Sequence, residues 1–100
     1  MTPETGRLYR IVIRGDWLLR DEDIVAQYLG EEWFYGEGGG KRFRFHPLVS
    51  DSPPTGRTDF TLRASDFEKY CTAEVFREDL PTYFNWSFRT PHFDRVLKGA

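Results

Sequence analysis

Short segments in which apolar and polar side chains alternate constrain the fold of this chain most, because a period of two is typical of a β-strand with one buried face. Residues 7–15 (RLYRIVIRG), 57–63 (RTDFTLR) and 82–90 (TYFNWSFRT) show this alternation. In the last of these segments, Phe84, Trp86 and Phe88 would share one face. Aromatic residues make up 17% of the chain. Large rings can therefore supply much of the core behind a small sheet.

A glycine-rich hairpin is predicted in the middle of the chain. Residues 31–47 (EEWFYGEGGGKRFRFHP) contain two short strand-like segments around four glycines, and the hairpin is expected to end at Pro47. The stretch is not a phosphate-binding loop, because the pattern G-x-x-x-x-G-K-[ST] needs glycine at position 35 and a hydroxyl at position 42. The chain has Tyr35 and Arg42 there. Residues 48–56 (LVSDSPPTG) are predicted to form a polar, proline-rich loop.

Three segments have helical signals. Residues 21–30 (DEDIVAQYLG) begin with acidic residues and end in glycine, which suits the two ends of a helix. Residues 65–68 (SDFE) fit a capping box, and the helix that follows is expected to place Phe67, Tyr70, Cys71 and Val75 on one face and to end before Pro81. Residues 90–97 predict a short final helix with proline at its first position. Residues 17–19 fit either the first helix or an extended lead-in.

These elements predict an α+β fold in one compact domain, residues 1–100. The order is β-α-β-β-β-α-β with a short C-terminal helix. It suits a mostly antiparallel sheet of four or five strands with two helices on one face. A ferredoxin-like arrangement with an added strand is one way to connect these elements.

The composition argues against several classes of protein. Mean hydropathy is −0.60 and no long apolar run occurs, so we expect no transmembrane helix and no membrane partner. The N-terminal residues contain no apolar signal-peptide core, and the chain has one cysteine; we therefore expect a cytoplasmic protein without disulfides.

The chain also lacks an evident catalytic or metal-binding pattern. With one cysteine and two histidines it is short of zinc ligands, and we expect no metal and no cofactor. Cys71 is expected to be a buried, inert thiol, and His46 and His92 to be surface residues. RGD at 14–16 is interpreted as a chance match. We expect no enzymatic activity.

The charges separate by segment. Residues 16–37 hold seven acidic residues and one arginine, whereas the predicted strands carry arginines opposite their apolar residues. The sequence thus predicts acidic helices on one side and an open, basic sheet face on the other. Three sets of candidate partner-binding residues follow. The acidic face comprises Asp16, Asp21, Glu22, Asp23, Glu31 and Glu32. The basic face and hairpin comprise Arg10, Arg14, Lys41, Arg42, Arg44, Arg63 and Arg89. The aromatic contacts are Trp33 and Tyr35.

Two functions from different classes fit these surfaces. In the first, the protein is a small non-enzymatic binding protein that acts through protein–protein contacts. Its compact size suggests, by analogy, a phage or mobile-element inhibitor of a host defence or nucleic-acid-handling protein. In the second, the basic sheet face binds single-stranded nucleic acid. That alternative gains support if Phe43 and Phe45 face solvent instead of the core. A homodimer through the open sheet face is compatible with the same pattern.

Overall fold

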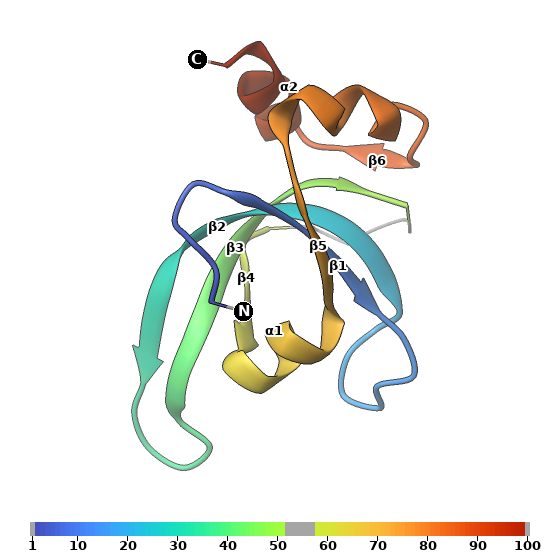
Figure 1. The fold of residues 1–100 in the computed structure, drawn as a ribbon. Coiled ribbons are helices and arrows are strands. Elements are labelled where there is room, and N and C mark those ends of the chain that lie inside the picture. Colours follow the sequence, from blue (N-terminus) through green and yellow to red (C-terminus); the bar gives the residue numbers. More distant parts are fainter. Residues whose placement is uncertain (1, 52–57, 100) are drawn as a thin grey trace.

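A computed structural model of the chain describes residues 2–51 and 58–99. Its centre is a curved antiparallel sheet in which five strands follow the order β4-β3-β2-β1-β5, and the short β6 pairs with the far end of β3 (Figure 1). The strands are β1 (Leu8–Ile13), β2 (Glu22–Phe34), β3 (Gly40–Ser50), β4 (Phe60–Arg63), β5 (Cys71–Val75) and β6 (Phe88–Arg89). The helices are α1 (Ala64–Tyr70), the 3-10 helix η1 (Arg77–Tyr83) and α2 (Pro91–Lys98).

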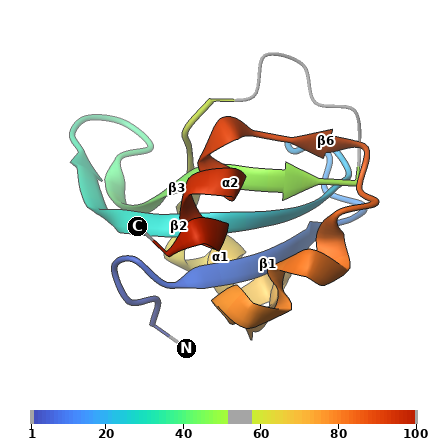
Figure 2. The same ribbon diagram turned by 90° about the horizontal axis from the view of Figure 1, so that it is seen from above.

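The predicted α+β class is confirmed, but the expected arrangement of helices is wrong. The sheet arches over α1, whereas η1, α2 and β6 lie on its opposite, convex side (Figures 1 and 2). The helices therefore cover both faces of the sheet instead of one. The ferredoxin-like arrangement is not observed, because β1 to β4 form consecutive antiparallel neighbours and β5 returns to pair with β1. The radius of gyration of 13.3 Å fits a compact domain of this length.

Strand β2 replaces the helix that was predicted over residues 21–30. It lies between β1 and β3 in the sheet, and both of its faces are covered over residues 24–26. Ile24 and Ala26 pack into the core under the arch, and Val25 packs into the core on the convex side. A strand buried on both faces loses the polar–apolar alternation, and its continuous apolar run then resembles a buried helical segment. Gly30 sits at a bulge with φ +139° instead of ending a helix.

The predicted hairpin is confirmed, with longer strands than expected. Residues 35–39 connect β2 to β3, and Gly36 and Gly38 adopt positive φ angles there. Strand β3 continues past Pro47 as far as Ser50, so the first part of the predicted 48–56 loop belongs to the sheet. Pro47 lies opposite Ala26 beside a register shift, where a missing N–H is tolerated. The rest of that loop, residues 52–56, lies outside the described residues.

The second predicted helix exists, but its N-terminus and its length differ from the prediction. Helix α1 begins at Ala64, one residue before Ser65, so the predicted capping box is not its N-terminus; Arg63 occupies the N-cap without a side-chain cap bond. The chain leaves the helix at Cys71 and runs as β5 along the open edge of β1. Pairing with that edge outweighs the weak helical preference of residues 71–75, which is a common way for tertiary contacts to override local propensity.

The C-terminal third also differs from the prediction. Pro81 lies inside the 3-10 helix η1, and only Phe88 and Arg89 of the predicted strand 82–90 are in a strand. Phe84 and Phe88 are partly exposed instead of lining the core. The final helix is confirmed: α2 starts at Pro91 after Thr90, whose hydroxyl donates to the carbonyls of Pro47 and Leu48 and ties the helix start to β3.

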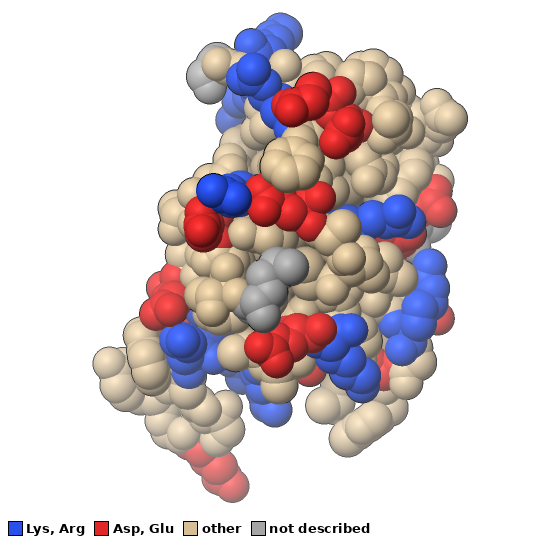
Figure 3. Space-filling view, in the orientation of Figure 1, with Lys and Arg blue, Asp and Glu red and all other residues tan. Residues whose placement is uncertain are grey.

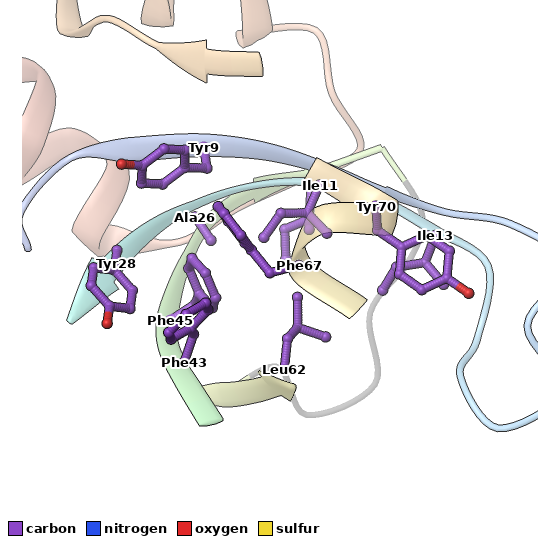
Figure 4. Packing of buried hydrophobic residues seen from close by; sticks show 11 residues of the cluster. Tyr9, Ile11, Ile13, Ala26, Tyr28, Phe43, Phe45, Leu62, Phe67 and Tyr70 are labelled. Atoms are coloured by element: carbon purple, nitrogen blue, oxygen red, sulfur yellow. The ribbon is translucent and has the colours of Figure 1, made fainter. Parts of the chain in front are cut away.

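Two apolar cores result, one on each face of the sheet. Under the arch, Phe67 of α1 packs against the rings of Tyr9, Phe43 and Phe45, with centroid separations of 5.4–5.7 Å (Figure 4). On the convex side, Leu80 of η1 and Phe93 of α2 are fully buried against the sheet. Phe43 and Phe45 therefore face the core, as the strand pattern predicted.

Candidate interaction surface

The basic residues of the sheet do not form an open positive face. Arg10 binds Asp23 through two hydrogen bonds of 3.0 and 2.8 Å, and its guanidinium lies 5.3 Å from the centroid of the Trp86 ring. The hydrogen bonds to Asp23 raise the pKa of Arg10. Because Trp86 follows η1 on the convex side, the C-terminal segment covers this part of the predicted basic face.

The remaining predicted cations are mostly engaged with nearby groups. Lys41 pairs with Glu31 at 3.4 Å, and Arg44 pairs with Asp59 at 3.1 Å and with Glu32 at 4.0 Å. Figure 3 shows positive and negative side chains intermixed over the visible face. The others are distributed as follows: Arg42 stacks on the Phe34 ring, Arg89 pairs with Asp94, Arg14 donates to the Ile13 carbonyl, and Arg63 is exposed in edge strand β4.

The predicted acidic helix face does not exist, because its residues lie in the β1–β2 loop and in β2. Glu22 and Asp23 are buried, and Glu31 and Glu32 are cross-strand neighbours of the cations of β3. Asp21 accepts a hydrogen bond from the Gly15 amide. The carboxylates of residues 16–37 thus support the strands and loop around them, and their predicted role in partner binding stays a prediction.

Asp16 organises the β1–β2 loop, residues 14–21. Its carboxylate accepts hydrogen bonds from the amides of Leu18 and Leu19 at 2.8 and 3.2 Å and from the Tyr70 hydroxyl of α1. The Tyr70 bond, together with the Leu18 bond, lowers the pKa of Asp16. Residues 17–19 therefore form a loop whose amides are bound by the Asp16 carboxylate, and they form neither a helical turn nor an extended lead-in. Leu19 packs against the core, while Trp17 and Leu18 point outward.

Exposed aromatic residues gather on two projections. Trp33, Phe34 and Tyr35 lie at the far end of the β2–β3 hairpin, and Trp17 and Leu18 lie on the β1–β2 loop. Their side chains are 59% exposed at Trp33, 93% at Tyr35 and 90% at Trp17. Both projections extend from the end of the molecule opposite α2, one on each side of α1 (Figure 1). We call these five residues the aromatic surface.

A groove adjoins the loop part of the aromatic surface. Leu18 and Leu19 face Thr61 and Leu62 of edge strand β4 across a hollow of about 340 Å³, and a second hollow of about 230 Å³ shares these four residues. The second hollow is also bordered by charged side chains, among them Arg42 and Arg63. Arg20 and Glu22 border the first hollow, so both hollows combine leucines with charged side chains, as is common at protein-binding sites.

A polar cluster joins α2 to the sheet, and sequence reasoning missed it. His46 of β3 pairs with Asp59, and its ring lies 4.4 Å from that of His92, which is within 2.6 Å of Gln27 Oε1. Burial, followed by the nearby His46, lowers the pKa of His92. Burial alone would raise the pKa of Asp59, but hydrogen bonds from His46 and Arg44 lower it. No local pattern relates residues so far apart in the sequence, so only the fold brings them together.

The lone thiol stands apart from this cluster. Cys71 is in β5, which is separated from β3 by β1 and β2. It is half-buried, and burial raises the pKa of its thiol above the ordinary value, which reduces the thiolate that could act as a nucleophile. Among residues 2–51 and 58–99, no three His, Cys, Asp or Glu side chains are grouped so that they could hold a metal ion.

Comparison of the chain with protein-family models, with curated proteins and with solved structures found no match. No helix in the described part of the chain is long and apolar enough to cross a membrane.

Proposed function

We propose that this chain is a small non-enzymatic binding protein that acts through protein–protein contacts made by the aromatic surface. The observation that carries the proposal is the nearly complete exposure of Trp17 and Tyr35, with Trp33 beside Tyr35. Exposing large rings to water is unfavourable, and tryptophan and tyrosine are the residues most enriched where binding energy concentrates. A partner that covers both projections would bury these rings together.

The loop part of this surface is held in place before binding. Asp16 fixes the loop through two backbone amides and the Tyr70 hydroxyl, so Trp17 is presented by an ordered turn. A preorganised loop loses less conformational entropy when it binds. The 14–21 loop can therefore contribute affinity without first having to fold.

Single-stranded nucleic acid is the weaker candidate partner. The predicted basic face has most of its cations next to carboxylates, with Arg10, Lys41, Arg44 and Arg89 all in ion pairs. The rings of Phe43 and Phe45 are buried and cannot stack on bases. Binding a polyanion depends on cations that can neutralise phosphates, so these pairs oppose it.

A pull-down of the tagged protein from lysate of its native source tests the proposal. We expect a protein partner that survives nuclease treatment and is lost with the double variant Trp17→Ala, Tyr35→Ala. One buried anchor contributes about 2 kcal/mol or more, which is roughly a 30-fold change in affinity. By analogy with phage or mobile-element inhibitors of similar size, we propose that the partner is a host defence or nucleic-acid-handling protein.

The double variant Arg44→Glu, Arg89→Glu is the matched control, because both exposed side chains belong to the predicted basic face and lie outside the aromatic surface. It should retain the partner. Loss of all captured material on nuclease treatment, or loss with the arginine variant but not with the aromatic variant, would favour nucleic acid and contradict the proposal.

A further inference from the structure

The outer half of β2 has an edge without a neighbouring strand. β1 pairs with β2 from Ile13 opposite Glu22 to Leu8 opposite Gln27, and the last contacts are hydrogen bonds between Tyr28 and the backbone of Gly6 and Arg7. β2 itself continues to Phe34. Within the part of the chain that the structure describes, no strand pairs with this side of residues 29–34 (Figure 1).

The edge is free because the chain turns away from it. The Arg7 amide donates to the Glu4 carbonyl in a tight turn, and Gly6 adopts φ +87°. The Glu4 amide then donates to the Tyr9 hydroxyl, which draws the preceding residues away from β2. Without this turn, the residues before β1 would continue antiparallel along residues 29–34 and close the edge.

The side chains along this edge are unusually apolar for an unpaired strand. Leu29 and Trp33 are both exposed there. Unpaired edges are normally protected by short strands, lysines or prolines. Between Leu29 and Phe34 the strand contains neither lysine nor proline. Its only protection is the bulge beside Gly30 and two negative charges.

Those charges oppose pairing with a second copy. Suppose that two copies pair antiparallel through this edge, related by a two-fold axis, to form a continuous sheet. Directly opposite residues then point to the same face of the sheet, so the axis must pass beside a residue and its own copy. The two registers with the greatest overlap of residues 29–34 are therefore centred on Glu31 or on Glu32. Each register sets a glutamate directly against its own copy, and like charges in that position are destabilising. The edge therefore disfavours its own copy and suits a strand with basic residues.

Both glutamates are available to such a strand. The Glu31–Lys41 and Glu32–Arg44 pairs are long, at 3.4 and 4.0 Å, and both are solvent-exposed. Exposed ion pairs of this kind contribute about 0–1 kcal/mol, so exchange for a cation of the partner costs little. From the register with β3, Glu31 and Trp33 share one face, so an incoming strand can place a basic and an apolar residue side by side there.

We propose that the free edge of β2, residues 29–34, binds an extended segment of a partner protein as an added antiparallel strand. The segment carries lysine or arginine beside Glu31 and Glu32 and an apolar side chain against Trp33. Main-chain hydrogen bonds supply affinity in this mode, and alternate side chains supply specificity. The inference rests on the proposed protein-binding function and specifies how the hairpin takes part in it.

Amide chemical shifts of the full-length protein, followed during titration with two synthetic peptides, test this mode. The peptides are TTVKKVT and TTVEEVT, which differ only in the sign of their charged residues. In the antiparallel register the two lysines lie opposite Glu32 and Glu31, and the valine before them lies opposite Trp33. We expect the lysine peptide at millimolar concentration to shift the amides of residues 29–34, and the glutamate peptide to bind at least about tenfold more weakly. The double variant Glu31→Lys, Glu32→Lys should reverse this preference.

Absence of shifts with both peptides would overturn the proposal, and so would shifts confined to α2 or η1, or an unchanged preference in the charge-reversed variant. These outcomes are separate from the test of the proposed function. A partner that is captured through Trp17 and Tyr35 while the lysine peptide leaves β2 unaffected would retain the function and reject strand addition.

Discussion

Replacement of Phe67 by alanine tests the packing of α1 under the arched sheet. The Phe67 ring is fully buried and contacts the rings of Tyr9, Phe43 and Phe45. Truncation of a buried phenylalanine to alanine costs about 3–5 kcal/mol, because transfer free energy is lost and a cavity remains. Domains of this size are stable by about 5–15 kcal/mol, so we expect Phe67→Ala to lose a large fraction of the free energy of unfolding and to unfold at a clearly lower urea concentration.

Phe88→Ala is the matched control for this experiment. Phe88 would be a core residue in the predicted strand 82–90, but in the structure its side chain is 37% exposed and lies in the two-residue strand β6. We expect its removal to lower the free energy of unfolding by about 1 kcal/mol. Urea titration followed by circular dichroism measures both variants. Equal losses in the two variants, or a loss below about 1 kcal/mol for Phe67→Ala, would refute the reasoning.

Three further predictions concern ionisable side chains. Asp23→Asn should lower the free energy of unfolding by about 1–3 kcal/mol, since Arg10 loses a charged two-point acceptor; an unchanged urea midpoint would contradict this. Because the pKa of His92 is lowered in the folded protein, the unfolded chain takes up a proton at this residue at higher pH than the folded protein does. The free energy of unfolding should therefore fall as the pH is lowered from about 7 to about 5, and should fall less steeply in His92→Gln. The raised pKa of Cys71 should make iodoacetamide alkylation slower than that of free cysteine at about pH 7.5; equal rates would argue against it.

The alternation of apolar and polar residues predicts much of the sheet correctly. At the centre of the sheet, however, the sequence predicts a helix where the structure has strand β2. β1, the β2–β3 hairpin, β4 and α2 are confirmed, because each has a clear alternation, turn or terminal signal in its own sequence. β2 over residues 22–30 could not be recognised, since Val25 and its neighbours Ile24 and Ala26 are buried on opposite faces. Whether an apolar run is covered on one face or two depends on contacts far away in the sequence.

The candidate surfaces show the same limit. The sequence identifies Trp33 and Tyr35 as aromatic residues close to the glycine-rich tip, and both are exposed in the structure. The charged faces were inferred from segment totals. Once residues 21–30 form a strand, Asp23 and Glu31 become neighbours of Arg10 and Lys41. A charge sum along the chain does not show which opposite charges the sheet will place side by side.

Amide hydrogen exchange of the protein with and without the captured partner tests the central claim most directly. We expect the bound partner to slow exchange in the β1–β2 loop around Trp17 and in the hairpin around residues 33–35, and to leave exchange in α2 and η1 unchanged. Protection confined to α2 and η1, with both aromatic projections exchanging as in the free protein, would contradict the claim that the aromatic surface is the binding site.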